Sequence, residues 1–481
     1  MSLNDKYEVV IGLEVHAQLL TNSKLFCGDS IAFGAEPNTH ISPITMGHPG
    51  TLPKTNKKAV EYAIKMGLAC NCTIEKDNYF ARKNYFYPDL PKGYQISQHT
   101  TPICKGGYVT IKTATGVRNV RLNRIHLEED AGKSIHDIDE QYTCIDLNRA
   151  GTPLVEIVTE PDVFSADEAW QYVTEIRKLV RWIGICDGNM EEGSLRCDAN
   201  VSIRLKGEKE LGTKVEVKNL NSIRNVKKAI EYEVDRMIEL VEKGGKVQQQ
   251  TRSFDATNDT TFALRDKEEA NDYRYFPDPD LAPFQLTDIF INTVRQTIPA
   301  LPNELIKKYQ THYGLSLYDA EQICDEQETA LFFESVIKHS DEHKAVANWM
   351  IGPLRQYLND KEINFRKLKL SPILLAELIK LVADSKVSFS VASSKILPAM
   401  IEGKGTALEI VESLNLLQVS DTNELEIWIR ETLNSMPEKV IEYKKGKKGL
   451  IGLFVGDVKK RSQGKADPKI VTQIIEQKLT H

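Results

Sequence analysis

One segment of the chain, residues 123–134, concentrates side chains that could do chemistry. It reads Asn-Arg-Ile-His-Leu-Glu-Glu-Asp-Ala-Gly-Lys-Ser, so a histidine, three consecutive acids and a lysine fall in one turn-length stretch behind a short apolar alternation. Neighbouring carboxylates repel one another, and a folded protein keeps such a group in water or around a cation. A solvated charged loop and a cation site are both open here. The Gly-Lys-Ser ending is not a Walker-type phosphate loop, because Leu127 stands where that motif needs its first glycine.

Two strand-like segments carry further candidate ligands. Residues 7–20 alternate with period two, which places Glu14 and His16 on the same face of a predicted strand. On a second predicted strand, residues 153–160, Glu156 shares a face with apolar side chains, and an acid in such surroundings is seldom buried without a partner. A divalent cation would suit these three side chains, although an exposed sheet face would equally carry Glu14 and His16.

A predicted hairpin supplies groups for an anionic ligand. Residues 195–218 alternate so that one face packs on a core and the other is polar. The polar face is either simply exposed to solvent or forms the floor of a cleft. Its candidate binding residues are Arg196, Asp198, Asn200, Lys214, Glu216 and Lys218. Arg149, in the turn that precedes residues 153–160, is a further cationic candidate.

Two segments combine aromatic and basic residues. Residues 82–94 mix aromatics, bases and prolines, and could stack a nucleic-acid base or simply pin a loop to the core. Arg274 lies between two tyrosines, where it could clamp a phosphate or carboxylate with two parallel hydrogen bonds or form a surface stack.

Length and composition favour a cytoplasmic protein of several domains. The 481 residues suggest two to four domains, and a hydrophobic content of 41% is enough for real cores. The net charge of −6 gives no overall case for a polyanion ligand. Eight cysteines without paired spacing and the lack of a signal peptide favour a reducing compartment. No apolar run approaches the ~20 residues of a membrane span, so we expect no membrane partner.

The end of the chain differs from the rest in charge. From about residue 294 the pattern becomes helical, and residues 436–481 hold eleven Lys/Arg against five Asp/Glu. This local surplus is typical of a nucleic-acid-binding surface, with a solubilising tail as the alternative. The candidate contacts are Lys444, Lys445, Lys447, Lys448, Lys459, Lys460, Arg461 and Lys465.

Motifs spread along the whole chain resemble one family, the B subunits of the aspartyl/glutamyl-tRNA(Asn/Gln) amidotransferases. The motifs that carry the resemblance are Ile11-Gly-Leu-Glu-Val-His16, Phe33-Gly-Ala-Glu-Pro-Asn38, Arg82-Lys-Asn-Tyr-Phe-Tyr-Pro88, His126-Leu-Glu-Glu-Asp-Ala-Gly-Lys133, Asp146-Leu-Asn-Arg-Ala-Gly-Thr-Pro-Leu-Val-Glu-Ile157, Met190-Glu-Glu-Gly-Ser-Leu-Arg-Cys-Asp-Ala-Asn200, Lys218-Asn-Leu-Asn-Ser222 and Asp272-Tyr-Arg-Tyr-Phe-Pro277. The related archaeal protein carries a large inserted domain, for which this chain has no room.

The resemblance implies an α+β fold in three parts. An antiparallel-sheet, cradle-shaped catalytic domain is expected at residues 1–293 and an all-α helical domain at 294–408. A small α-helical tail domain similar to YqeY proteins is expected at 409–481, where its basic surface would bind tRNA.

The resemblance also implies a reaction and its partners. ATP with magnesium phosphorylates the side-chain carboxylate of Glu-tRNA(Gln) or Asp-tRNA(Asn), and ammonia then displaces the phosphate to give the amide. The amidase subunit of the complex releases that ammonia from glutamine and an internal channel delivers it, while a small third subunit belts the two together. The rival interpretation is a tRNA-binding scaffold that has no phosphoryl-transfer chemistry of its own.

Roles follow for the residues on the matching motifs. We expect magnesium or manganese to be held by Glu14, His16, Glu129 and Glu156, with Glu128 as a further ligand candidate. The predicted catalytic residues are Glu14, His16, Glu129, Lys133, Glu156 and Asp198. The predicted nucleotide- and substrate-binding residues are Arg149, Arg196, Asn200, Lys214, Glu216, Lys218 and Arg274.

One departure from the family pattern concerns an early loop. Many members carry two cysteine pairs there as a zinc site, whereas this chain has Cys27 with Asp29, Ser42 and Thr45 in the other three places. Because a closed structural zinc site needs four soft ligands, we predict no zinc and expect packing to hold the loop.

Overall fold

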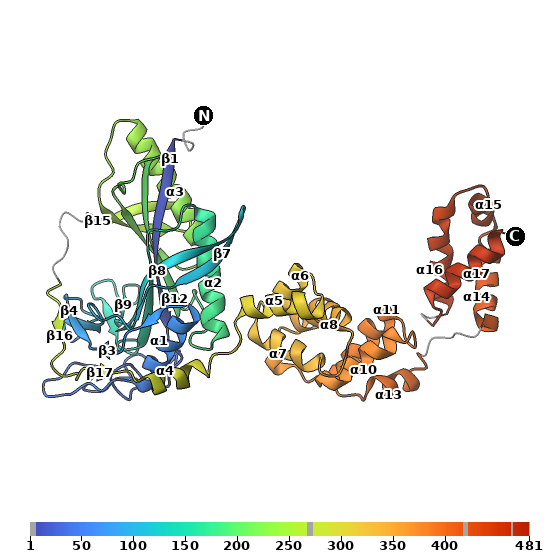
Figure 1. Ribbon diagram of the computed structural model, residues 1–481, viewed down its shortest axis with the longest axis horizontal. Helices are drawn as coiled ribbons and strands as arrows, with labels where there is room; N and C mark the ends of the chain where they lie inside the picture. Colours follow the sequence, from blue (N-terminus) through green and yellow to red (C-terminus); the bar gives the residue numbers. More distant parts are fainter. Residues whose placement is uncertain (1–5, 267–272, 417–421, 463–464, 481) are drawn as a thin grey trace. The chain divides into compact units, whose positions relative to one another are not determined.

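The computed structural model describes residues 6–266, 273–416, 422–462 and 465–480. The chain divides into two compact units, residues 1–301 and 302–481, and each is described by itself (Figure 1). The first unit is built around a large sheet with helices packed against it, and the described part of the second is helical. This arrangement confirms the predicted α+β class. The expected domain boundaries after residues 293 and 408 stay predictions.

The large sheet runs in the order β15-β14-β13-β12-β1-β11-β8-β5-β4-β16. Its strands are β1 (Tyr7–Gln18), β4 (Ala81–Asn84), β5 (Tyr94–Ser97), β8 (Gly116–Glu129), β11 (Pro153–Thr159), β12 (Leu195–Leu205), β13 (Val215–Leu220), β14 (Gln250–Asp255), β15 (Thr260–Asp266) and β16 (Phe276–Pro277). The short β2 (Thr73–Ile74) and β6 (Cys104–Lys105) pair at its side, and β7 (Tyr108–Thr113) pairs with β8. Two small ribbons join β9 (Lys133–Ile135) to β10 (Cys144–Asp146) and β3 (Asp77–Asn78) to β17 (Phe284–Gln285).

The sheet departs from the antiparallel prediction at one pair of strands. β12 and β13 form the predicted antiparallel hairpin, but β14 then lies parallel to β13. The chain between them contains helix α3 (Ile223–Glu242), and a helix returns the chain to the start of a parallel neighbour in this way. The other paired strands along the described sheet path are antiparallel.

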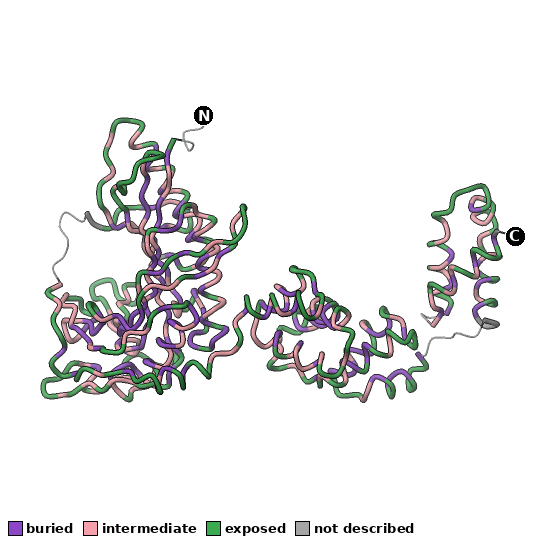
Figure 2. The backbone as a smooth tube through the Cα atoms, in the orientation of Figure 1, coloured by how far each residue is buried: buried purple, intermediate pink, exposed green. Residues whose placement is uncertain are grey.

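Strand β1 lies near the middle of the sheet because its period-two alternation separates two faces. Leu13, Val15 and Ala17 are fully buried on one face. Helices α1 (Lys57–Ala69), α2 (Ala166–Trp182) and α3 contact the strands of this sheet, α2 touching β1 directly. In Figure 2 buried residues follow these strands and helices, whereas exposed residues follow the connecting loops. The alternate residues of β1 are thereby left to face the polar side.

Helix α2 begins after Ser165, which is its N-cap. The Ser165 hydroxyl accepts a hydrogen bond from the Glu168 amide at 3.1 Å. In a full capping box the Glu168 carboxylate would accept from Ser165, but here it accepts from the Phe164 amide and pairs with Arg118. The Ser165–Glu168 capping box is therefore half formed, and the Glu168 carboxylate contacts Phe164 and Arg118 instead.

Most helices lie in the second unit. After α4 (Asp288–Arg295) of the first unit they are α5 (Pro302–Tyr313), α6 (Leu317–Ile323), α7 (Gln327–Val336), α8 (His343–Trp349), α9 (Arg355–Asp360), α10 (Pro372–Ala383), α11 (Phe389–Val391), α12 (Leu397–Ile401), α13 (Ala407–Ser413), α14 (Thr422–Ser435), α15 (Pro437–Lys444), α16 (Ile451–Arg461) and α17 (Pro468–Thr480). Helices α14 to α17 share an apolar core that includes Leu425, Ile429, Phe454 and Ile475. Within the described parts of the chain, none of the helices combines the length and the hydropathy that crossing a bilayer requires.

Candidate active site

The register of four neighbouring strands lines up one row of functional side chains. His16 on β1 stands opposite Glu156 on β11 and, on its other side, opposite Arg196 on β12. Glu156 in turn stands opposite His126 on β8. Directly opposed residues of an antiparallel pair have Cβ atoms about 4.5–5.5 Å apart, so side chains far apart in sequence are forced together. The row is therefore fixed by sheet register rather than by a loop.

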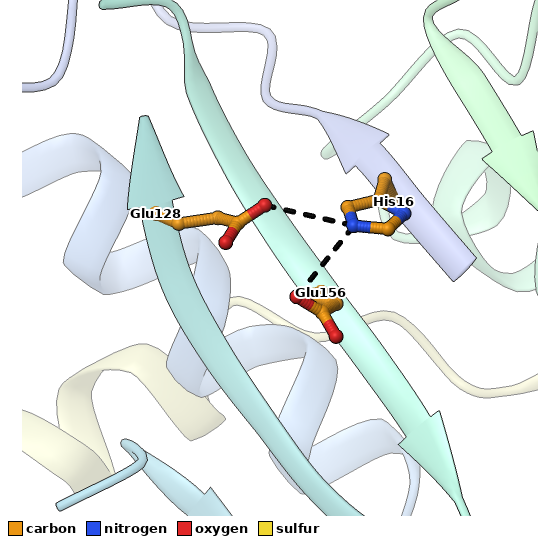
Figure 3. A group of neighbouring side chains, drawn as sticks. All are labelled: His16, Glu128 and Glu156. Atoms are coloured by element: carbon orange, nitrogen blue, oxygen red, sulfur yellow. Dashed lines mark ion pairs between the residues drawn. The ribbon is translucent and has the colours of Figure 1, made fainter. Parts of the chain in front are cut away.

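His16 and Glu156 of this row converge on one point with Glu128, which lies two residues beyond His126 on the same face of β8 (Figure 3). The His16 Nε2 atom is 3.6 Å from a Glu128 oxygen and 3.5 Å from a Glu156 oxygen. One ligand atom from each of the three side chains lies within 4.8 Å of the others. Among the described His, Cys, Asp and Glu side chains, these three form a group that is close enough to share one ion. Its members come from β1, β8 and β11.

The side chains of the cluster shift one another's pKa values. Burial would lower the pKa of His16, but the hydrogen bond and charge of Glu156 and the charge of Glu128 outweigh it and raise that pKa to about 9. Burial likewise raises the pKa of Glu156, yet the two neighbouring histidines bring it well below its usual range. Burial and the charge of Glu156 raise the pKa of Glu14. His16 and Glu156 therefore each favour the charged form of the other, and a cation that binds Nε2 of His16 has to displace its proton.

His126 contacts the carboxylates of Glu128 and Glu156 from the buried side of the cluster. Its Nε2 atom is 3.3 Å from a Glu156 oxygen and 3.7 Å from a Glu128 oxygen. Arg124 donates to the other ring nitrogen, Nδ1, at 3.4 Å, which leaves Nε2 to carry the proton toward the acids. His126 is 4% exposed, so the two carboxylates are held by a buried donor that cannot turn away. Such partners orient ligand side chains in metal sites.

The donor set fits a divalent cation. Two carboxylates and one imidazole suit manganese or magnesium better than a structural zinc, which favours thiolates and a closed shell of four protein ligands. Mg²⁺ is commonly held by one or two carboxylates and completes its shell with water and substrate phosphates. His16, Glu128 and Glu156 are the residues that would hold such an ion.

The cluster forms part of the wall of a cavity of about 880 Å³. Cations on the same wall are Lys83, Arg124, Lys133, Arg196 and Lys218, and the aromatic residues are Tyr85, His99, His126, Tyr273 and Tyr275. Glu14, Asp198, Glu216 and Asp130 add further carboxylates. A cavity of this volume is of the size that holds a nucleotide or a similar ligand.

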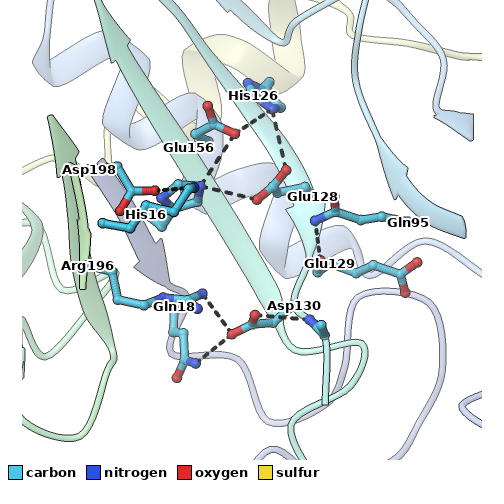
Figure 4. A network of polar contacts seen from close by, with 12 residues as sticks. His16, Gln18, Gln95, His126, Glu128, Glu129, Asp130, Glu156, Arg196 and Asp198 are labelled. Carbon is cyan, nitrogen blue, oxygen red and sulfur yellow. Dashed lines mark hydrogen bonds and ion pairs between the residues drawn. The ribbon is translucent and has the colours of Figure 1, made fainter. Parts of the chain in front are cut away.

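Ion pairs fix two of the cationic side chains of the cavity, Arg196 (Figure 4) and Lys218. Arg196 donates to Asp130 at 2.9 Å, and Gln18 donates to the same carboxylate oxygen at 3.1 Å. The charge of Asp130 and its hydrogen bond raise the pKa of Arg196 above its ordinary value despite burial. Lys218 donates to Asp198 at 2.9 Å. These pairs hold fixed positive groups around the central carboxylates.

Glu129 does not join the cluster, which corrects the prediction. Strand β8 extends through Glu129, past the short apolar alternation seen in the sequence, so Glu128 and Glu129 point to opposite faces. Both Glu129 carboxylate oxygens accept from Lys92, at 2.5 and 2.6 Å, and one accepts from the Ile96 amide. Figure 4 shows the Glu129 side chain pointing away from His16. It lines a separate cavity of about 210 Å³ instead.

Several predicted binding residues lie outside the lining of the large cavity. Arg149 donates to the backbone carbonyls of Ala131 and Gly132, so it shapes the turn after β8. Asn200 does not line the cavity itself, but its side-chain amide donates a hydrogen bond at 2.9 Å to Glu14, which does. Lys214 is exposed before β13, and Arg274 is exposed between the tyrosines. Their predicted contacts with nucleotide or substrate have no geometric support. Asp272 lies outside the described residues.

The remaining predicted residues are brought to the cavity. The structure places Glu14, Lys133, Asp198, Glu216 and Lys218 on its wall, with Lys133 exposed at the start of β9. Sequence reasoning missed His126, Lys83, Tyr273 and Tyr275 as site residues. For His126 a signal existed: continuing the period-two alternation through residues 122–129 puts it on the face of Glu128.

Hydrogen bonds link three of the four positions compared with a zinc site, Cys27, Asp29 and Thr45. Thr45 donates to Asp29 at 2.5 Å, and Cys27 lies 3.3 Å from the same carboxylate. A fully buried neighbour, Lys24, donates to the carbonyl oxygens of His40 at 2.7 Å and Leu147 at 3.2 Å. A network of side-chain hydrogen bonds thus ties this loop to the segment before β11.

Comparison with known proteins places this architecture in a family. Residues 9–292 match the family model described as the GatB/GatE catalytic domain, and residues 331–479 match the model described as the GatB domain. Among the aspartyl/glutamyl-tRNA(Asn/Gln) amidotransferase B subunits, that of Thermodesulfovibrio yellowstonii is 48% identical over 470 residues, 98% of each chain. The relative of the same name from Geotalea uraniireducens is 49% identical over 477 residues, 98% of this chain and 99% of that one.

A third relative gives the same result. The protein of the same name from Persephonella marina is 47% identical over 475 residues, which cover 98% of this chain and all of the relative. Both family models and all three relatives agree over nearly the full length of the chain. The chain therefore belongs to the family of aspartyl/glutamyl-tRNA(Asn/Gln) amidotransferase B subunits.

Proposed function

We propose that this chain is the component of a tRNA-dependent amidotransferase that activates and amidates a misacylated tRNA. Its substrate would be Glu-tRNA(Gln), Asp-tRNA(Asn) or both, and its products Gln-tRNA(Gln) and Asn-tRNA(Asn). The observation that carries the proposal is the convergence of His16, Glu128 and Glu156 in the wall of a nucleotide-sized cavity. Membership of the family of B subunits supplies the reaction to which that cluster is matched.

The chemistry explains why the reaction needs ATP. A carboxylate is a poor acceptor for ammonia, because its leaving group would be an oxide ion. In the first step an oxygen of the substrate carboxylate attacks the γ-phosphorus of ATP, and ADP leaves. In the second step the nitrogen of ammonia attacks the acyl carbon, the phosphate leaves with the bonding electrons, and the nitrogen loses a proton. Such phosphoryl transfer depends on positioning and charge neutralisation more than on covalent help from the protein.

Different residues of the cavity would bind the cation and the anionic groups. His16, Glu128 and Glu156 would hold Mg²⁺, which when bound neutralises phosphate charge and fixes the position of the phosphates. Arg196 and Lys218, each fixed by a carboxylate partner, would face the anionic groups of nucleotide and substrate. Their ion pairs keep the two side chains oriented before the substrate binds.

The proposal includes the partners of the chain. The relatives are named as one lettered component of an enzyme, which implies an assembly of several subunits. We infer that an amidase subunit provides ammonia from glutamine and that a small third subunit completes the complex. The basic surface of α15 and α16, including Lys444, Lys445 and Lys460, would contact the tRNA backbone, and the assembly would act in the cytoplasm.

A single-site variant separates an enzyme from a scaffold. The purified three-subunit complex is given labelled ATP, glutamine and glutamyl-tRNA, and ATP cleavage that depends on the acylated tRNA is measured. Glu156→Gln removes one buried charge of the cluster and should abolish that cleavage, whereas Glu140→Gln, an exposed acid outside the cavity, should not. If Glu156→Gln cleaves ATP at the wild-type rate, the chain is a scaffold for tRNA and the proposal is wrong.

A further inference from the structure

One edge of the large cavity is aromatic, in contrast to its charged centre. Tyr85, His99, Tyr273 and Tyr275, here called the aromatic rim, all line the cavity that contains the His16 cluster. The rings of His99 and Tyr275 are stacked, with centroids 4.0 Å apart and planes inclined by 6°. Tyr273 packs edge-on against both Tyr275 and Tyr85, with centroids 6.1 Å apart in each pair. Tyr85 follows β4, His99 follows β5, and Tyr273 and Tyr275 precede β16.

The backbone is shaped to present the two tyrosines of this segment. Arg274 adopts a left-handed conformation with φ 45°, which is costly for a residue with a Cβ atom. Asn84 at the end of β4 holds it there, because its side-chain amide donates to the carbonyl oxygens of Tyr273 and Arg274 at 3.2 and 2.8 Å. Tyr273 and Tyr275 thus line the cavity while Arg274 is exposed.

The cavity is therefore divided by chemistry. Its carboxylate cluster and the cations Arg196 and Lys218 suit phosphate groups with a divalent ion. The aromatic rim suits a flat ring, and Lys83, whose Nζ atom lies 4.9 Å from the centroid of Tyr273, adds a positive group beside it. A molecule that carries phosphates at one end and a planar heterocycle at the other matches both parts.

We propose that the aromatic rim binds an adenine base by stacking. This inference rests on the proposed function and extends it, because it assigns the part of the cavity that recognises the base rather than the phosphates. Two ligands of the proposed reaction carry adenine, ATP and the 3′-terminal adenosine of tRNA, and both would have to reach this cavity. Stacking tolerates any aromatic surface and contributes about 1–3 kcal/mol per base, which corresponds to an affinity change of about 5- to 150-fold.

The test compares a ligand with a base to one without. In the three-subunit complex we would measure the binding of magnesium–ATP and of magnesium–tripolyphosphate, together with the KM values for ATP and for glutamyl-tRNA. Tyr273→Leu and Tyr275→Leu remove rings of the rim. Tyr275→Phe restores the ring without the hydroxyl, and Tyr108→Leu, on β7 and outside the cavity lining, is the matched control.

If the rim holds the base of ATP, the leucine variants bind ATP about 5- to 150-fold more weakly while tripolyphosphate binding stays within about twofold. If it holds the terminal adenosine, ATP binding is unchanged and the KM for glutamyl-tRNA rises by a similar factor with kcat retained. Either result supports the proposal when Tyr275→Phe restores most of the loss.

Three results would overturn the proposal. If the leucine variants keep the wild-type affinity for magnesium–ATP and the wild-type KM for glutamyl-tRNA, the aromatic rim has no role in base recognition. An equal loss of ATP and tripolyphosphate would mean that the variants damage the phosphate end or the fold. A wild-type complex that binds neither magnesium–ATP nor magnesium–tripolyphosphate would remove the proposed function as well, so the two failures can be told apart.

Discussion

Glu128 and Glu129 are neighbours on one strand, yet their carboxylates serve different faces of the sheet. The Glu128 carboxylate lies 3.6 Å from His16 and 3.7 Å from His126, whereas that of Glu129 binds Lys92 at 2.5 Å. Successive residues of a strand point to opposite sides, so this separation follows from the extension of β8 through both. The two acids can therefore be tested independently by the same chemical change.

Removing one charge at a time should separate their roles. Glu128→Gln takes away an anionic ligand, and we expect the affinity for Mn²⁺ to fall by about tenfold or more. Glu129→Gln weakens the contact with Lys92 but leaves His16, Glu128 and Glu156 in place, so Mn²⁺ affinity should stay within about twofold. Isothermal titration of the full chain measures both. An equal loss in the two variants would contradict the assignment of faces.

His126 should matter to cation binding without being a ligand. It holds Glu156 and Glu128 from the buried side, and the loss of such an orienting partner lowers metal affinity by about 10- to 100-fold. His126→Gln should show that loss in Mn²⁺ titrations, whereas His136→Gln, which changes an exposed histidine outside the cavity, should not. Wild-type affinity in His126→Gln would show that the carboxylates need no support from this side.

The local part of the site could be predicted from sequence alternation. Period two assigned Glu14 and His16 to one face of β1 and located the hairpin of β12 and β13, and the structure has both. The same rule was not carried into the acidic segment, where three consecutive acids interrupt the alternation of apolar and polar residues. The apolar residues Ile125 and Leu127 extend the alternation up to Glu128, and that detail decides which acid faces the histidines.

The non-local part could not be predicted from composition or spacing. The contact of His126 with Glu156 depends on the register between β8 and β11, and the contact of Glu129 with Lys92 joins segments 37 residues apart. The parallel pairing of β13 with β14 depends on how α3 returns the chain. Each of these contacts is set by packing of the whole sheet, so no single segment carries a signal for it.

The basic tail can be tested with residues that the structure leaves exposed. Lys444, Lys445 and Lys460 are exposed, whereas Arg461 is bound to Asp457 at 2.6 Å. The triple change of these lysines to alanine should weaken tRNA binding and reduce the slope of log Kd against log salt by about one for each lost phosphate contact. Lys386→Ala, an exposed lysine after α10, is the control. An unchanged salt slope would dismiss the tail as a tRNA contact.

The ion pair between Asp162 and Arg121 should contribute to stability in a pH-dependent way. Burial alone would raise the pKa of Asp162, but hydrogen bonds from Arg121 outweigh this and lower it below its ordinary value. A carboxyl group whose pKa is lowered by folding stabilises the folded state above its unfolded pKa, and that stability is lost as the pH falls through the folded pKa.

The variant Asp162→Asn tests this contribution. It should lower the free energy of unfolding by about 1 kcal/mol or less at pH 7, because Arg121 is exposed and water screens the pair, and the difference from wild type should stay constant down to about pH 5. Below about pH 4 the difference should shrink as the wild-type carboxyl group takes up its proton. Unfolding midpoints by calorimetry over this range give the comparison. A difference that grows toward acid pH would contradict the sign of the argument.

The most direct test of the central claim is to locate a divalent cation in the full chain. Crystals grown with Mn²⁺ and ATP, measured at the manganese absorption edge, should give an anomalous peak between His16, Glu128 and Glu156, about 2.0–2.4 Å from their ligand atoms. A manganese peak beside Glu129 in the smaller cavity, with none at these three residues, would contradict the account.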